Sequence, residues 1–99
     1  MDLKVEKNDI SLTIEQVKNH TKDTIINQYI YLRKEKGYSQ EKIAEMTGIA
    51  RTNIVRIESK ANVPTIEVLT KLAMALDMEL EIKFVPKINT RKEPDSNEQ

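Results

Sequence analysis

The chain has 99 residues, and its 16 Lys and Arg residues balance its 16 Asp and Glu residues, so its formal net charge is zero. Hydrophobic residues make up 38% and charged residues 32%, which is typical of one small, charge-rich helical domain. The absence of cysteine excludes disulfides and thiolate metal sites, and the single His20 excludes a multi-histidine site within one chain. No apolar run approaches the ~18 residues of a membrane span. We expect a cytoplasmic protein with no cofactor and no metal.

The first strong helical pattern begins after Thr13. Gln16 follows three residues later, which is the spacing of a capping box. A helical stretch is expected from about residue 14, resuming after Thr21 and ending at Gly37. Its apolar positions have the spacing of an amphipathic helix and are Ile25, Ile26, Tyr29, Ile30 and Leu32.

Two short helices and a longer one are expected next. Ser39 is a good N-cap for the first, which Gly48 ends after two turns. The second is expected over residues 50–58, followed by an irregular connection and a third helix that starts near Thr65. The expected core residues of this third helix are Ile66, Leu69, Leu72, Ala73 and Leu76.

Beyond Asp77 the apolar period changes to two. Leu80, Ile82 and Phe84 alternate with charged residues, which predicts a half-buried strand that Pro86 ends. A single strand in a helical domain cannot satisfy its own backbone groups. It must pair with a second copy, another chain or the N-terminal segment. We expect these three residues to form a dimerisation surface, and residues 87–99 to be a disordered polar tail.

The two short helices carry the functional argument. Ala44 would let a second helix cross closely, and Gly48 suits the tight turn of a helix-turn-helix arrangement. If Ile54 and Ile57 are buried, ~100° per residue leaves an outward face of four residues. These four are Arg51, Thr52, Val55 and Arg56. Arg can bind guanine edges bidentately, and Val or Thr can contact a thymine methyl, so this face is suited to base recognition.

The charge distribution agrees with this interpretation. Residues 33–60 hold seven basic and four acidic residues, a local excess of three positive charges in a chain whose total is zero. The excess lies on the two short helices and their surroundings, where DNA phosphates would approach.

Several short motifs of the chain fall together in register. They are Ser39-Gln40, Ile43-Ala44-Glu45, Gly48-Ile49, Arg56-Ile57-Glu58 and Pro64-Thr65. With them, residues 25–78 resemble the Xre, or Cro/phage-repressor-like, helix-turn-helix family. The resemblance implies a lambda-repressor-like bundle of about five helices that binds operator DNA as a homodimer, with its second motif helix in the major groove.

The resemblance also implies roles for single residues. Arg51, Thr52, Val55 and Arg56 match its base-reading positions. Arg33 and Glu58 match a partly buried structural ion pair. The positions expected to hold phosphates are Ser39, Gln40, Asn53, Ser59, Lys60 and Asn62.

Two positions depart from the family pattern. Ala50 stands where Ser or Thr is frequent, and the missing side-chain cap should cost about 1 kcal/mol. Lys60 stands where Gly is usual, so that the phosphate clamp in this loop is reduced to Lys60 with Ser59 and Asn62.

The segments around the motif suggest a narrower resemblance. We divide the chain into an N-terminal, partly helical extension (1–22), a helix-turn-helix domain (23–78), a dimerisation strand (79–86) and a tail (87–99). This architecture resembles HigA-like antitoxins, which implies repression of their own operon and neutralisation of a small RelE-fold toxin. A stand-alone dimeric regulator and a protein-interaction module without DNA binding are the alternatives. An enzyme is not expected, because no nucleophile–base pair or glycine-rich phosphate loop is present.

Overall fold

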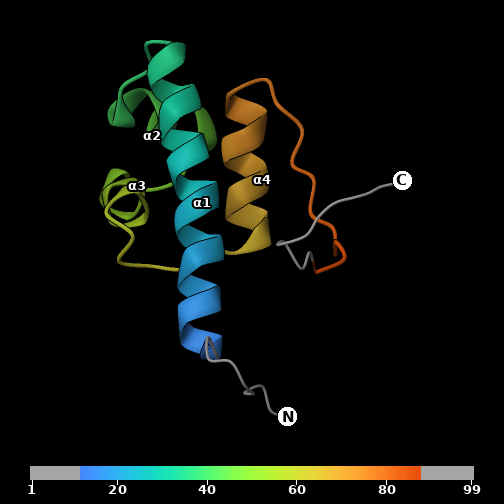
Figure 1. The fold of residues 1–99 in the computed structure, drawn as a ribbon. Coiled ribbons are helices and arrows are strands. Elements are labelled where there is room, and N and C mark those ends of the chain that lie inside the picture. Colours follow the sequence, from blue (N-terminus) through green and yellow to red (C-terminus); the bar gives the residue numbers. More distant parts are fainter. Residues whose placement is uncertain (1–11, 88–99) are drawn as a thin grey trace.

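The protein is described here by a computed structural model, which covers residues 12–87 and contains four helices in that range. They are α1 (Ile14–Glu35), α2 (Gln40–Thr47), α3 (Arg51–Glu58) and α4 (Ile66–Ala75). In Figure 1, α1 is the long central helix, with α3 to one side and α4 to the other. The mainly helical fold is confirmed, but the described residues form four helices where about five were expected.

The difference in number arises in α1, which is one continuous helix across the expected interruption at Thr21. The hydroxyl of Thr13 accepts from the Gln16 N–H at 3.0 Å, and the Gln16 side chain accepts from the Thr13 N–H at 2.9 Å. The predicted capping box is thus confirmed. No Gly or Pro lies within this helix to break it. One long helix therefore replaces the two shorter stretches, and it crosses the boundary drawn between residues 22 and 23.

The predicted turns around α2 are also confirmed. Gly37 and Gly48 have φ angles of 74° and 78°, the left-handed region that favours glycine. The Ser39 hydroxyl accepts from the Lys42 N–H at 2.9 Å and so caps the start of α2. These local signals set the angle at which α2 leaves α1 and enters the turn to α3.

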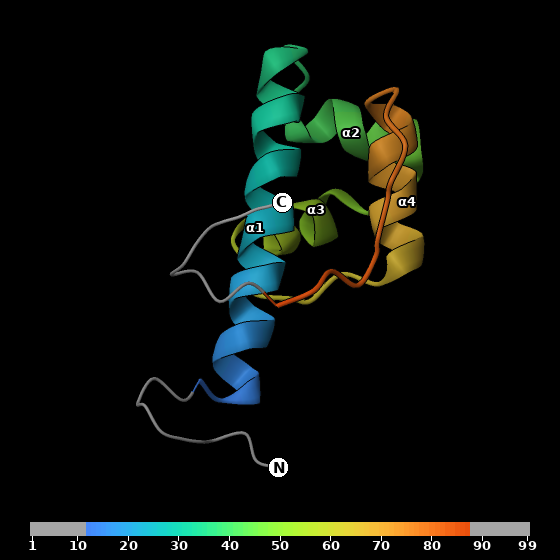
Figure 2. The ribbon, with the colours of Figure 1, turned by 45° about the vertical axis from the view of Figure 1, so that its right-hand side comes forward.

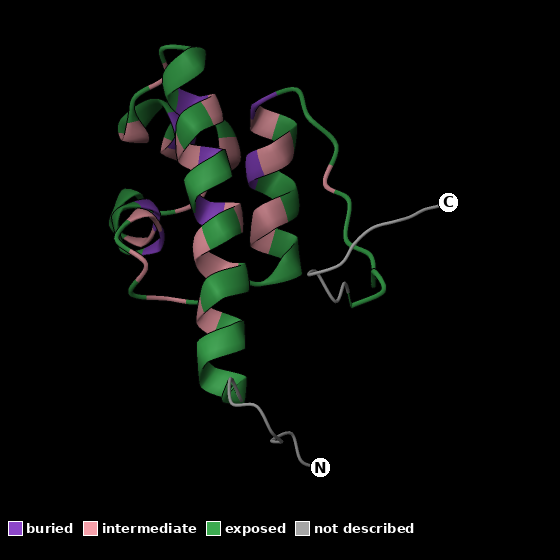
Figure 3. Cartoon of the chain, in the orientation of Figure 1, coloured by how far each residue is buried: buried purple, intermediate pink, exposed green. Residues whose placement is uncertain are grey.

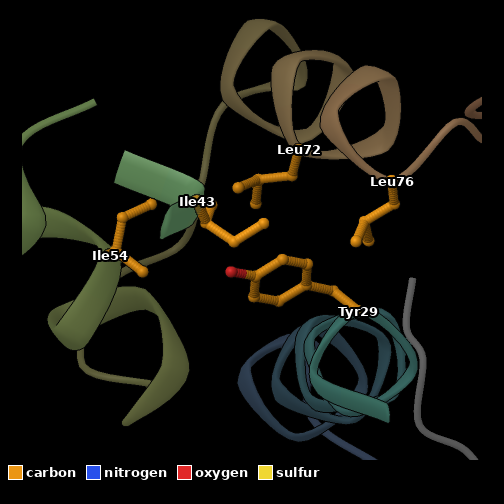
Figure 4. Close-up of a cluster of buried hydrophobic side chains, with 5 residues drawn as sticks. All are labelled: Tyr29, Ile43, Ile54, Leu72 and Leu76. Atoms are coloured by element: carbon orange, nitrogen blue, oxygen red, sulfur yellow. The ribbon is translucent and has the colours of Figure 1, made fainter. Parts of the chain in front are cut away.

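The core lies where the four helices meet. Figure 4 shows its central cluster, to which every helix contributes. This cluster consists of Tyr29, Ile43, Ile54, Leu72 and Leu76. Figure 3 shows that the buried positions face one another across the bundle, whereas the first turns of α1 are largely exposed.

One expected core residue is misplaced. Ile66 is 64% exposed, because it lies about 120° around α4 from Leu72 at ~100° per residue, away from the buried face. The helical pattern of α4 was correct, but its first apolar residue belongs to the surface.

The predicted C-terminal strand is not formed within the part of the chain that the structure describes. Residues 78–87 are extended without a strand partner there; they pass along α4 and then toward α1 (Figure 2). Leu80 is half-buried, whereas Ile82 is 61% exposed and Phe84 fully exposed. A strand needs a hydrogen-bonded neighbour, and a single copy supplies none among residues 12–87. The N-terminal residues 1–11 and the tail 88–99 lie outside the described residues.

Candidate nucleic-acid interface

The outward face of α3 is the candidate DNA-binding surface. Ile54 and Ile57 are buried beneath this helix, with exposed fractions of 0% and 2%. The four residues predicted to contact bases are all exposed: Arg51, Thr52, Val55 and Arg56. Val55 is 38% exposed, although branched apolar side chains are usually buried. The helix therefore presents two guanidiniums, a hydroxyl and an apolar group to the solvent.

The turn between α2 and α3 is stabilised locally. Gly48 donates its N–H to the Ala44 carbonyl at 2.9 Å. The Thr47 hydroxyl accepts from the Ile49 N–H at 3.1 Å and donates to the Ile43 carbonyl at 2.7 Å. By contrast, Ala50 caps α3 without a side-chain hydrogen bond, as the sequence predicts. The turn is thus well satisfied, but α3 begins with a weak cap.

A buried ion pair joins α3 to α1. Arg33 Nε and Nη2 lie 2.8 Å from the two carboxylate oxygens of Glu58, which is a bidentate arrangement. Arg33 Nη1 also donates to the Tyr38 carbonyl at 2.7 Å. The two charged side chains are only 11% and 7% exposed. This pair fixes the end of α3 against the long helix.

Gln40 contacts the same carboxylate. Its Nε2 donates to Glu58 Oε1 at 3.1 Å, so α1, α2 and α3 converge on one side chain. Gln40 was predicted to contact phosphate. In the structure it is half-buried, and one N–H of its side-chain amide is donated to Glu58. The amide therefore aligns the two motif helices, and its second N–H is available to another acceptor.

Tyr29 lies beside this cluster within the core. Burial raises the pKa of its hydroxyl above the usual range, and the nearby Glu58 carboxylate raises this pKa further. The hydroxyl oxygen has no well-aligned hydrogen-bond partner among the described residues. Tyr29 is consequently neutral at any working pH, and its ring acts as a core side chain (Figure 4).

Three predicted DNA-binding residues, two on α3 and one in the loop that follows it, are joined by hydrogen bonds. Asn62, in the loop that follows, accepts from Arg56 Nη2 at 3.3 Å and donates to Asn53 Oδ1 at 3.4 Å. The amide of Asn62 thus links the two α3 side chains. The Ser59 hydroxyl donates to the Arg56 carbonyl at 3.0 Å, which occupies it with the helix end.

The loop itself begins with a residue in an unusual conformation. Lys60 has a φ of 67°, which explains why glycine is common at this position in the resembling family. The N–H groups of Lys60 and Ala61 donate to the Ile57 and Arg56 carbonyls at 2.9 and 3.0 Å, closing a Schellman motif.

Lys22 is a residue that sequence reasoning missed. Its Nζ donates to the Lys60 carbonyl at 3.0 Å, and its side chain is 13% exposed. The contact spans 38 positions in sequence, and it joins α1 to the loop after α3. No local pattern could have revealed it, because it depends on how α1 crosses α3.

At the other end of α3, Arg51 lies beside the start of α2. Ser39 and Arg51 line one shallow hollow together with Glu41 and Glu45. Lys42 lines the same hollow, and its Nζ lies 3.9 Å from Glu45 Oε1, so both signs of charge are present at the start of α2.

Together, the paired short helices, the left-handed turn at Gly48 and the exposed polar face of α3 define a helix-turn-helix DNA-binding domain. Residues 30–83 match the Helix-turn-helix family HTH_3, and the chain belongs to this family of Xre-type regulators. Over 58 residues it is 36% identical to the uncharacterized HTH-type transcriptional regulator YgzD of Bacillus subtilis (strain 168). The match covers 59% of this chain and 88% of YgzD. No solved structure matches the chain.

These findings identify a DNA-binding transcriptional regulator. Within residues 12–87, no helix is both long and apolar enough to cross a membrane.

Proposed function

We propose that the chain is a sequence-specific, dimeric repressor whose α3 enters the major groove of operator DNA. The main support for this proposal is the exposed face of α3, which carries two arginines and Val55. The opposite face of the same helix is buried in the core through Ile54 and Ile57. Arg51 and Arg56 would contact base edges, and Thr52 and Val55 would contact thymine methyl groups. Such a regulator acts in the cytoplasm, where its operator lies.

The phosphate contacts are assigned around this helix. Gln40, Asn53, Lys60 and Asn62 would fix the register of the domain on the duplex, together with Ser39 and Ser59. The bonds of Asn62 to Arg56 and Asn53 support a common position for these groups at one edge of α3. A phosphate at this edge would accept from the side-chain amides of Asn53 and Asn62 and leave Arg56 to the bases.

Substitution of Arg56 tests the base-reading role. An operator would first be selected from random duplexes with the full chain, and Arg56→Ala would then be compared on operator and random DNA. We expect operator affinity to fall by ~1–3 kcal/mol, with a much smaller loss on random DNA. Arg56→Lys keeps the charge but not the bidentate geometry, so it should retain random binding only.

Lys34→Ala is the matched control, because Lys34 is an exposed cation on α1 outside the motif. It should leave both affinities within about twofold, in line with a distant surface charge. Equal losses of Arg56→Ala on operator and random DNA would show that Arg56 contacts phosphate only.

A protein partner is a second proposal, namely that the chain is the antitoxin of a type II pair and neutralises a RelE-fold toxin. The first turns of α1 extend beyond the bundle in Figure 1 and support this idea. They expose Ile14 and Val17, which are 78% and 47% exposed and lie on a different helix from the candidate DNA-binding face. The two residues are one turn apart on α1, and contiguous exposed apolar groups mark protein contacts.

Co-expression with the products of the two neighbouring genes tests this second proposal. We expect one small neighbour to co-purify with the chain and to arrest growth when expressed alone. Ile14→Lys with Val17→Lys should abolish co-purification and leave DNA binding intact. If neither neighbour binds or is toxic, the chain is a stand-alone dimeric regulator.

A further inference from the structure

Residues 79–85 form an unpaired backbone edge on the surface. No backbone hydrogen bond joins them to any other residue in the described range 12–87. Two large apolar side chains of this segment, Ile82 and Phe84, are more than half exposed. An apolar, extended edge of this kind is a template for pairing with another strand.

The two faces of this segment differ in chemistry. Leu80 is half-buried and lines an apolar groove between α1 and α4. Ile82 and Phe84 would share the face of Leu80 once the segment pairs as a strand, because side chains of a strand alternate. Glu81 and Lys83, which alternate with them, lie side by side, with Oε2 and Nζ 3.2 Å apart. The segment thus alternates apolar and charged residues and carries a pair of opposite charges.

We propose that residues 79–85 pair antiparallel with the same residues of a second copy, with Ile82 opposite the partner's Ile82. This register places Glu81 opposite the partner's Lys83, and Lys83 opposite the partner's Glu81. Opposite charges attract in such cross-strand pairs. On the apolar face, Leu80 lies opposite the partner's Phe84.

The neighbouring registers are worse for electrostatic or packing reasons. A pairing centred on Glu81 sets this carboxylate against the same carboxylate of the partner, and one centred on Lys83 sets two ammonium groups together. A shift by a single residue places the charged face of one strand on the apolar side of the other. Only the register centred on Ile82 satisfies both faces.

The same register gives Phe84 a place to bind. The groove beside Leu80 has a volume of about 210 Å³ and is lined by apolar residues of α1 and α4, among them Ile25, Leu69 and Leu76. Because Phe84 lies opposite the partner's Leu80, its ring is brought to the mouth of the partner's groove. The fully exposed aromatic ring and the open groove therefore complement each other between two copies.

Reversing the charges of Glu81 and Lys83 tests this register. The register itself rests on the dimer of the proposed function. Glu81→Lys and Lys83→Glu each create two like-charged pairs per dimer, so each should weaken self-association about tenfold in sedimentation. An equimolar mixture of the two variants should associate at least as tightly as the unaltered chain, as should the double variant within one chain. A pairing centred on Glu81 predicts no recovery in the double variant, so a failure to recover overturns the register.

A disulfide measurement gives an independent answer, since the natural chain has no cysteine. In the proposed register, Ile82→Cys faces its own copy and should cross-link rapidly on oxidation. Phe84→Cys is the control, because its copy lies four residues away, about 13 Å along the strand, and should not cross-link. Cross-linking at 84 instead of 82 overturns the register but leaves the dimer intact.

A chain that sediments as a monomer at every concentration overturns both the register and the dimer. DNA contact by α3 would be judged separately by the Arg56→Ala comparison, which depends on no residue of the strand. The two proposals can therefore fail independently.

Discussion

The helix-turn-helix region and the C-terminal segment differ in where their polar groups find hydrogen-bond partners. In the first, local hydrogen bonds close the C-terminal ends of α2 and α3, and Glu58 accepts from both Arg33 and Gln40. In the second, residues 79–87 have no backbone partner in the described range and keep Phe84 in solvent. The helix-turn-helix region is therefore satisfied within one copy. The proposed strand at residues 79–85 would form only when another chain pairs with it.

The largest expected effect is on the first region, from Glu58→Ala. This substitution leaves Arg33 as a buried charge without its carboxylate, because both side chains are nearly inaccessible. The free energy of unfolding should fall by about 3–5 kcal/mol, measured by urea denaturation. Lys71→Ala, which removes an exposed pair with Glu67, should change it by less than about 0.5 kcal/mol. Similar small losses for both variants would contradict the role of Glu58.

Ile82→Asp acts on the second region alone. It should convert the proposed dimer to monomers, because each interface loses an apolar side chain from both copies and gains two like charges. We expect the association free energy to weaken by about 3 kcal/mol, measured by sedimentation. The helical circular dichroism of the monomer should remain unchanged. A dimer that survives this change would exclude the strand as the interface.

Ala50→Ser tests whether the start of α3 lacks a side-chain cap. Ala50 occupies the cap position without a side-chain hydrogen bond. A serine hydroxyl could accept a free N–H in the first turn and stabilise the domain by about 1 kcal/mol. Thermal unfolding measures the gain, and Ala50→Val, which has no acceptor, serves as the control. Equal stability of the two variants would show that this helix end is satisfied in another way.

The smallest effects concern two left-handed residues, one after α3 and one before the C-terminal segment. Lys60 and Asp77 have φ angles of 67° and 59°. Lys60→Gly should stabilise the fold by about 1 kcal/mol, and Asp77→Gly by less, because Asp tolerates this conformation better than Lys. Lys60→Ala loses the side chain but keeps the unfavourable backbone, so it should give no gain. Urea denaturation of the three variants compares them directly.

Much of the local structure could be predicted from particular residues. The Thr13–Gln16 capping box, the Ser39 cap and the turn at Gly48 are all formed. Each is encoded within four residues, so its energy depends little on distant groups. Errors occurred where the signal was weak or non-local. A helix break was predicted at Thr21, but α1 is continuous there. Ile66 was predicted to lie in the core, but its side chain is exposed.

Helix caps, apolar periodicity and the outward face of α3 follow from short-range rules, so the class of this protein could be predicted from the printed residues. Which distant groups meet depends instead on how the helices pack. Glu58 joins three helices, Lys22 reaches the Lys60 carbonyl across 38 residues, and the groove between α1 and α4 stays open beside Leu80. These contacts depend on the crossing of packed helices, which no spacing along the chain specifies.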